Sequence, residues 1–170
     1  MLHVALIGNE NVGKTSLIDT YAGKSFTPEY VPTVFKNYTG TTVETKQRMT
    51  LYDSSGMTQY SALRPLGYPK IDVFILVFSV VDRASFTILP QWVSECQYHR
   101  PSTPFLLVGT KIDLPKRCVS TQEAENIIKS LGAQTYLECS AKTGKNVQHL
   151  FRCAIAIGLR YKKPSNCIIM

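Results

Sequence analysis

A glycine-rich segment near the amino end has the residue types and spacing of a phosphate-binding loop. Residues 8–16 read GNENVGKTS and match the pattern G-x-x-x-x-G-K-S/T at Gly8, Gly13, Lys14 and Thr15. In such a loop, backbone N–H groups converge on a phosphate chain, and the following helix presents its positive end to the same anion. Lys14 can reach the β- and γ-phosphates, and the Thr15 hydroxyl can ligate Mg²⁺. The other loop residues predicted to surround the phosphates are Asn9, Glu10, Asn11, Val12 and Ser16.

Two later segments favour guanine as the base. In GTKID, residues 109–113, the carboxylate of Asp113 can accept the N1 and N2 donors of guanine, a pair that adenine does not present. The stem of Lys111 can lie along the purine face. In CSAK, residues 139–142, a backbone N–H can meet guanine O6. The residues predicted to contact the base are Thr110, Lys111, Asp113, Ser140, Ala141 and Lys142.

A third segment has the features of a sensor for the terminal phosphate. DSSG, residues 53–56, follows a predicted strand, so Asp53 can hold Mg²⁺ through water and the Gly56 N–H can meet a γ-phosphate oxygen. Thr33 lies in a polar segment before the second strand, where its hydroxyl can complete the metal shell. Loops of this kind are ordered by the γ-phosphate and released without it. The predicted metal residues are therefore Thr15, Thr33 and Asp53.

The elements that position these loops alternate between strands and helices. We predict strands at residues 2–7, 34–44, 47–52, 72–80, 104–110 and 135–139, with the second and third joined near Thr45. Helices are predicted from the phosphate loop to Ala22 and at residues 82–98, 120–131 and 146–161. Asp82 can cap the second of these, and Ser120 with Glu123 can form a capping box at the start of the third. This alternation favours an α/β fold with a parallel sheet and helices on both faces. The binding loops then all lie at the carboxyl ends of strands, where open sheets bind ligands.

Composition is that of one globular domain in a reducing compartment. The 170 residues are 44% hydrophobic and 18% charged, with no apolar stretch long enough to span a bilayer. The five cysteines are odd in number and form no C-x-x-C pair, which argues against a disulfide framework or a zinc site. The net charge of +7 invites anionic partners, but the basic residues are scattered without an aromatic RNA-binding signature. We expect a monomer that does not bind nucleic acid.

With these motifs, the chain resembles the Ras superfamily of small GTPases, and most closely the Rho/Rac branch, over essentially its whole length. The branch-level residues are YVPTVFKNY (30–38), LRPLGYPKIDVF (63–74) and GTKID. The resemblance implies a P-loop NTPase fold with a six-stranded, mostly parallel sheet and about five helices, binding GTP or GDP with Mg²⁺. It implies that Phe26 and Tyr30 flank the nucleotide and that Thr33 is the switch threonine. The implied effector surface consists of Val34, Phe35, Tyr38, Tyr60, Leu63 and Leu66.

Departures from the family pattern fall at positions that matter for catalysis. Glu10 stands where the family has glycine, and we expect its side chain to project toward the γ-phosphate and any arginine finger. Met57 replaces the water-orienting glutamine, and a thioether cannot position water as an amide does. Ser55 replaces an alanine. With Lys14, Thr33 and Gly56 retained among the catalytic positions, we expect GTP binding with very slow hydrolysis, or a chain that rests with GDP or empty. The helical insert usual for the Rho branch has no room after Asp113.

The tail predicts a lipid anchor. CIIM, residues 167–170, forms a C-a-a-X box in which Cys167 is the expected prenylation site and the terminal methionine favours farnesyl. Because one prenyl chain anchors weakly, Lys162 and Lys163 are expected to add a second signal. We therefore predict a G domain at residues 1–161 and a basic tail at 162–170. The expected location is the cytoplasmic face of a membrane, with a cytosolic pool.

Two function classes stay open. The leading one is a membrane-anchored signalling switch that binds effector proteins through its switch regions and is served by exchange factors or a prenyl-binding chaperone. The alternative is a non-cycling, GTP-bound interaction module regulated by its abundance. Glu10 and Met57 favour the second, whereas Thr33, Asp53 and Gly56 favour retained γ-phosphate sensing. A P-loop kinase is a distant third, because the base-reading segments indicate guanine.

Overall fold

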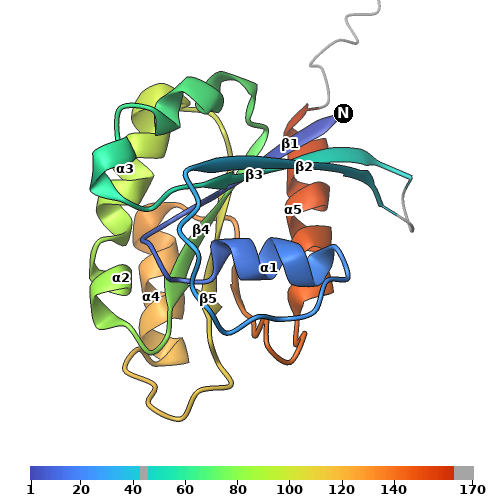
Figure 1. Cartoon of the computed structure of the whole chain (residues 1–170). Helices are drawn as coiled ribbons and strands as arrows, with labels where there is room; N and C mark the ends of the chain where they lie inside the picture. The colour runs from blue at the N-terminus through green and yellow to red at the C-terminus, as the bar shows by residue number, and fades with distance from the viewer. Residues whose placement is uncertain (43–45, 163–170) are drawn as a thin grey trace, which may run out of the picture.

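The computed structural model describes residues 1–42 and 46–162 and has a six-stranded sheet in the order β2-β3-β1-β4-β5-β6 (Figure 1). The strands are β1 (Leu2–Ile7), β2 (Phe35–Thr41), β3 (Arg48–Ser54), β4 (Val73–Ser79), β5 (Phe105–Thr110) and β6 (Tyr136–Glu138). Only the β2–β3 pair is antiparallel among the pairs formed by described residues. The predicted α/β class and six-stranded, mostly parallel sheet are confirmed. The predicted join near Thr45 lies outside the described residues.

The central strands are buried along their whole length. Every residue of β4 and of β5 is buried, as expected for parallel strands covered on both faces. Their sequences, VFILVFS and FLLVGT, are rich in the β-branched and aromatic residues that suit such strands. By contrast, β2 forms an edge of the sheet, and nearly all its residues are exposed.

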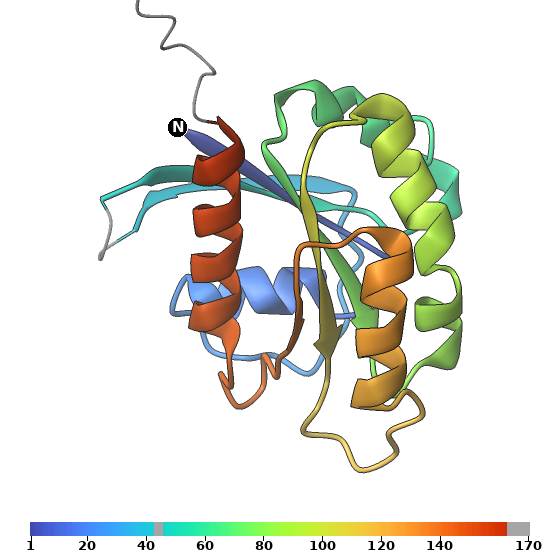
Figure 2. The same ribbon diagram turned by 180° about the vertical axis from the view of Figure 1, so that it is seen from behind.

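Two hydrophobic cores lie on opposite faces of the sheet. One face is covered by α1 (Lys14–Tyr21) and α5 (Val147–Lys162), which bury residues such as Leu17 and Phe151 (Figures 1 and 2). The other is covered by α2 (Arg83–Thr87), α3 (Leu89–His99) and α4 (Thr121–Leu131). This two-sided arrangement leaves the loops at the carboxyl ends of the strands free to form a site. No helix in the described residues combines the length and apolarity needed to cross a bilayer.

Helix boundaries follow local capping chemistry. Ser120 and Glu123 form the predicted capping box, in which each side chain accepts the other's backbone N–H, and α4 ends at the left-handed Gly132. Asp82 caps α2 as predicted, by accepting the N–H groups of Ala84 and Ser85. The prediction of one continuous helix over residues 82–98 was wrong. The chain breaks at Ile88 because Pro90 suits the first turn of a new helix and cannot continue the old one.

Two 3₁₀ segments were not predicted. These are η1 (Thr58–Tyr60) and η2 (Arg64–Lys70), and they follow the DSSG segment. Pro69 lies inside η2, which favours a short, tight helix over a regular α-helix. Between β5 and α4, residues 111–120 contain no helix, in keeping with the expected absence of an insert.

Candidate functional site

The phosphate loop passes from β1 into α1 and lies against β4. Gly8 has φ of 151°, and a Cβ at this position would lie 2.1 Å from the carbonyl oxygen of Val77. Only glycine therefore allows the loop to approach β4 so closely. α1 begins directly after Gly13, so its free N–H groups face the loop. This is the strand-loop-helix context that the sequence motif requires to bind phosphate.

Lys14 is a buried cation held over the loop. Only 6% of the residue is exposed, and its Nζ donates to the carbonyl oxygens of Gly8 at 2.9 Å and of Asn9 at 2.5 Å. Burial lowers the pKa of Lys14 to about 8, partly opposed by the negative charge of Asp53. A buried ammonium whose acceptors among the described residues are two carbonyl oxygens is suited to an anionic ligand, whose phosphate oxygens would restore the lost solvation.

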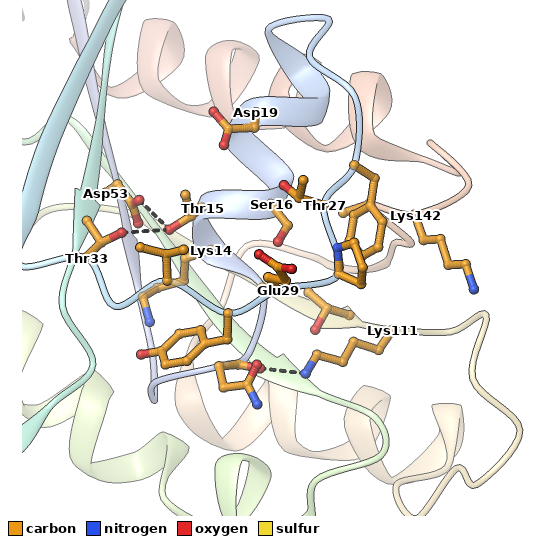
Figure 3. A pocket seen from close by; sticks show the side chains of 18 of the residues that line it. Lys14, Thr15, Ser16, Asp19, Thr27, Glu29, Thr33, Asp53, Lys111 and Lys142 are labelled. Carbon is orange, nitrogen blue, oxygen red and sulfur yellow. Dashed lines mark hydrogen bonds between the residues drawn. The ribbon is translucent and has the colours of Figure 1, made fainter.

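A divalent cation fits the site formed by Thr15, Thr33 and Asp53. The Thr15 hydroxyl donates to Asp53 Oδ2 at 2.6 Å and lies 3.2 Å from the Thr33 hydroxyl oxygen (Figure 3). Asp53 is fully buried, and its Oδ1 has no hydrogen-bond partner among the described residues. Burial accordingly raises the pKa of Asp53. An unpaired buried carboxylate oxygen beside two hydroxyls is a donor set that Mg²⁺ prefers, so the three predicted metal residues come together.

The predicted base-reading residues come from the ends of β5 and β6. Ser140 is fully buried and donates from its hydroxyl to Asp113 Oδ1 at 2.7 Å, which holds the Asp113 carboxylate in one orientation. Lys111 has a left-handed φ of 63°, and its Nζ donates to the Asn11 carbonyl oxygen at 2.6 Å (Figure 3). Burial lowers the pKa of Lys111. These contacts tie the base-reading loop to the phosphate loop.

Thr110, at the end of β5, connects the base-reading side of the site to the phosphate loop. Its hydroxyl is buried and lies 2.5 Å from the carbonyl oxygen of Val12 and 3.0 Å from that of Phe78. One hydroxyl thus joins the phosphate loop, β4 and β5. The role of Thr110 shown by these contacts is to fix the loop rather than to offer a polar atom to the base.

A cavity of about 410 Å³ joins the phosphate and base regions. That volume lies in the range of small-molecule sites. Of the predicted nucleotide contacts, the residues that line it are Asn11, Gly13, Lys14, Thr15, Ser16, Phe26, Tyr30, Thr33, Asp53, Gly56, Thr110, Lys111, Asp113, Ala141 and Lys142. The predicted contacts outside this lining are Gly8, Asn9, Glu10, Val12 and Ser140. Lining residues that the sequence reasoning missed include Asp19, Thr27 and Glu29 (Figure 3).

The two unusual catalytic positions lie at the rim of the site. Glu10 is exposed and does not line the cavity, although its charge acts on the pKa of Lys14 and of Tyr30. Gly56 lies directly on the phosphate loop, since a Cβ there would come within 2.2 Å of the backbone of Asn9 and Glu10. Met57 follows it and donates its N–H to the Ser55 hydroxyl at 3.2 Å.

The predicted effector residues do not all share one face. Val34, Phe35, Leu63 and Leu66 are exposed, and the Phe35 ring lies against η2 at Gly67, which joins Phe35 to the surface of η2. Tyr60 ends η1 and is half-buried. Tyr38 packs against the core covered by α1 and α5, whereas Phe35 contacts Tyr52 of the opposite core. Side chains alternate along a strand, which explains why Tyr38 points away from this surface.

A network that joins the phosphate loop to α3 was not predicted from the sequence. The Trp92 indole N–H donates to Asn9 Oδ1 at 2.7 Å, across 83 residues of chain. Arg64 stacks on the Trp92 ring, 4.7 Å from its centroid, and forms a two-bonded ion pair with Glu95. No local motif predicts such contacts, because the partners come from different elements.

Comparison with known families agrees with this geometry. The model of the Ras family matches residues 3–157, which is most of the chain. Members of this family bind GTP and GDP, generally with Mg²⁺, and hydrolyse GTP. The cavity, the buried lysine and the carboxylate with two hydroxyls are the parts that such binding requires. The chain therefore belongs to the Ras family of small GTP-binding proteins.

Proposed function

We propose that this protein is a Rho/Rac-type switch that binds GTP with Mg²⁺, hydrolyses it very slowly and works at the cytoplasmic face of a membrane. The observation that carries slow hydrolysis is the pairing of an intact phosphate site with Met57 next to Gly56. The buried Lys14, the Thr15–Asp53 pair and Thr33 retain the groups that bind the phosphates. At the position after Gly56, the side chain is a thioether instead of an amide that could place the attacking water.

Each residue has a distinct task in this proposal. Lys14 neutralises charge on the terminal phosphates, and Asp113 accepts the guanine N–H groups while Ser140 holds its carboxylate. Asp53, Thr15 and Thr33 would hold Mg²⁺, which would supply positive charge to offset the negative charge that develops on the phosphates. Gly56 offers its backbone N–H toward the third phosphate. The arrangement is therefore complete for binding and incomplete for hydrolysis.

Met57 is the main cause of the proposed slow hydrolysis. Its backbone is fixed by the Ser55 hydroxyl on one side and by Arg64, which donates to its carbonyl oxygen at 3.3 Å, on the other. A side chain on this fixed backbone could act only through its own atoms, and a thioether has no N–H donor and is a weak acceptor. Phosphoryl transfer depends on positioning and electrostatics, so its loss slows the reaction.

Glu10 is a second cause of slow hydrolysis, because it opposes acceleration by activating proteins. Its exposed carboxylate lies on the phosphate loop, where an activating protein would have to insert an arginine beside the phosphates. A carboxylate there would pair with the arginine and hold it away from the γ-phosphate. We therefore expect activating proteins to give little acceleration.

Single-turnover hydrolysis of radiolabelled GTP on the purified chain tests this proposal. The parent protein should hydrolyse GTP very slowly, and Met57→Gln should accelerate it by about 10², the effect of one positioned hydrogen-bonding group. Glu10→Gly should change the intrinsic rate less and should restore the response to an activating protein. Rapid hydrolysis by the parent protein would refute the proposal.

The non-cycling interaction module is the second candidate, and Arg64 favours it. This side chain holds the segment after Gly56 through hydrogen bonds to Glu95 and to the carbonyl oxygens of Ser55 and Met57. A segment held in this way can present Leu63 and Leu66 to effectors with either nucleotide bound. Effector binding that is equal in the GTP and GDP forms would establish this candidate, whereas binding confined to the GTP form would establish the switch.

Membrane anchoring through prenylated Cys167 completes the proposal. Cys167 and Lys163 lie outside the described residues. Lys162 ends α5 and donates from Nζ to Asp72 at 2.8 Å and to the carbonyl oxygen of Met1 at 2.7 Å. Lys162 is therefore paired with an acidic residue of the domain, which reduces the charge that it offers to an anionic membrane surface. Fractionation of cells expressing Cys167→Ser should show the protein moved to the cytosol, and an unchanged membrane fraction would refute the anchor.

A further inference from the structure

Arg64 binds the carbonyl oxygens on both sides of Gly56. Its Nη1 donates to the carbonyl oxygen of Ser55 at 3.0 Å and to that of Met57 at 3.3 Å. The Arg64 side chain is 4% exposed, and Nε and Nη2 each donate at 3.0 Å to the two carboxylate oxygens of Glu95. Four of its donor contacts are thus directed to fixed acceptors, so the guanidinium has little freedom to move.

The peptide geometry turns this contact into a constraint on Gly56. The Ser55 carbonyl and the Gly56 N–H belong to one peptide group, which is planar and trans. The two bonds therefore point in opposite directions. When Arg64 holds the Ser55 carbonyl oxygen, the Gly56 N–H must point away from Arg64. Gly56 itself lies within contact of the phosphate loop, so this N–H has a fixed direction at the phosphate site.

Trp92 connects the same guanidinium to the phosphate loop. The indole ring stacks on Arg64, and its N–H donates to Asn9 Oδ1 at 2.7 Å. Asn9 also accepts the Lys14 ammonium on its backbone carbonyl oxygen at 2.5 Å. The residue that orients the phosphate-binding lysine is therefore joined, through one ring, to the residue that orients the Gly56 N–H.

We propose that Arg64 is the positioning residue for the Gly56 N–H that meets the third phosphate, and that Trp92 sets the place of Arg64 relative to the phosphate loop. The inference rests on the proposed function, because it assumes that the site binds GTP and GDP. The consequence concerns the choice between the two nucleotides. Arg64 supports discrimination of GTP from GDP, since only GTP has the phosphate that the Gly56 N–H meets.

The test compares the affinities of the full chain for GDP and for guanosine β,γ-imidotriphosphate, measured by displacement of a fluorescent GDP. Arg64→Lys retains the charge but cannot hold Glu95 and both carbonyls at once. It should weaken the triphosphate analogue about tenfold, the effect of about 1.4 kcal/mol, and GDP less than threefold. Trp92→Phe retains an aromatic ring but loses the bond to Asn9. It should lower the ratio of the affinity for the triphosphate analogue to the affinity for GDP about threefold.

Arg100→Lys is the matched control, because Arg100 holds the far end of η2 in a similar way. Its Nη1 and Nη2 donate to the carbonyl oxygens of Pro69 and Ile71 at 2.8 and 3.0 Å. If loosening η2 were sufficient to reduce the preference for the triphosphate, Arg100→Lys would change the affinity ratio as Arg64→Lys does. We expect instead that Arg100→Lys keeps the affinity ratio of the parent protein. Equal loss of both nucleotides in Arg64→Lys, or an unchanged ratio, would overturn the inference. Failure of the parent protein to bind either nucleotide would instead overturn the proposed function, and the inference with it.

Discussion

Binding of a guanine nucleotide should draw a proton onto Lys14 in mildly alkaline solution. In the free protein, burial places the pKa of Lys14 at about 8, so a substantial part of the population is neutral near that pH. Phosphate oxygens beside the ammonium favour its charged form, so binding raises the pKa. The bound state then holds more protons than the free state, and affinity must fall as the pH rises above about 8.

The size of the effect follows from that value. A group with a pKa of about 8 is roughly 0.1 deprotonated at pH 7, about 0.5 at pH 8 and about 0.75 at pH 8.5, so proton uptake on binding should rise in the same order. The affinity should fall about fourfold between pH 7 and pH 8.5. Phosphate groups titrate near pH 6, so their contribution shrinks over the same interval.

Calorimetry of GDP and Mg²⁺ binding to nucleotide-free protein measures this uptake directly. Titrations at each pH are run in two buffers with different ionisation enthalpies, and the difference in apparent heat gives the number of protons taken up. The predicted signature is uptake that increases from pH 7 to pH 8.5. Uptake that stays level or decreases would show that Lys14 is fully charged in the free protein, and would refute the reasoning from its burial.

Three substitutions test other parts of the structure. Gly8→Ala places a Cβ 2.1 Å from a β4 carbonyl oxygen, so it should abolish nucleotide binding and lower the free energy of unfolding by about 1–3 kcal/mol, measured by fluorescence titration and urea denaturation. Asp113→Asn replaces a charged acceptor and should weaken GDP binding by about 1.5–3 kcal/mol in a displacement assay; unchanged affinity would exclude Asp113 from the base site. Tyr38→Phe removes a buried hydroxyl that has no hydrogen-bond partner among the described residues, so thermal unfolding should show equal or slightly higher stability, by up to about 1 kcal/mol, and a clear loss would contradict the structure.

Features with local causes could be predicted from the sequence. The capping box at Ser120 and Glu123, the Asp82 cap and the buried strands β4 and β5 all follow from short-range patterns, and the structure contains them. The Thr15–Asp53–Thr33 cluster was also predicted. Thr15 and Asp53 meet because parallel strands bring their following loops to one edge of the sheet, and Thr33 joins them because the antiparallel strand β2 begins at that edge.

Features that depend on packing between distant elements could not be predicted. Arg64 and Glu95 are 31 residues apart, and their pairing depends on where η2 lies against α3. Met57 was identified from its position in the sequence, but the hydrogen bond from Arg64 to its carbonyl oxygen was not predicted. The break at Ile88 was missed for a different reason. Pro90 is plain in the sequence, but a proline can either begin a new helix or interrupt one, and the sequence alone does not distinguish these cases.

Competition between guanine and adenine nucleotides tests the central claim most directly. The Asp113 carboxylate, held by Ser140, is the acceptor that we propose distinguishes the two bases in this cavity. Displacement of fluorescent GDP from the purified chain, with Mg²⁺ present, should require about 10³-fold or more ATP than GTP, because ATP would leave the Asp113 carboxylate without a donor. Equal displacement by ATP and GTP, or displacement by neither, would contradict the account.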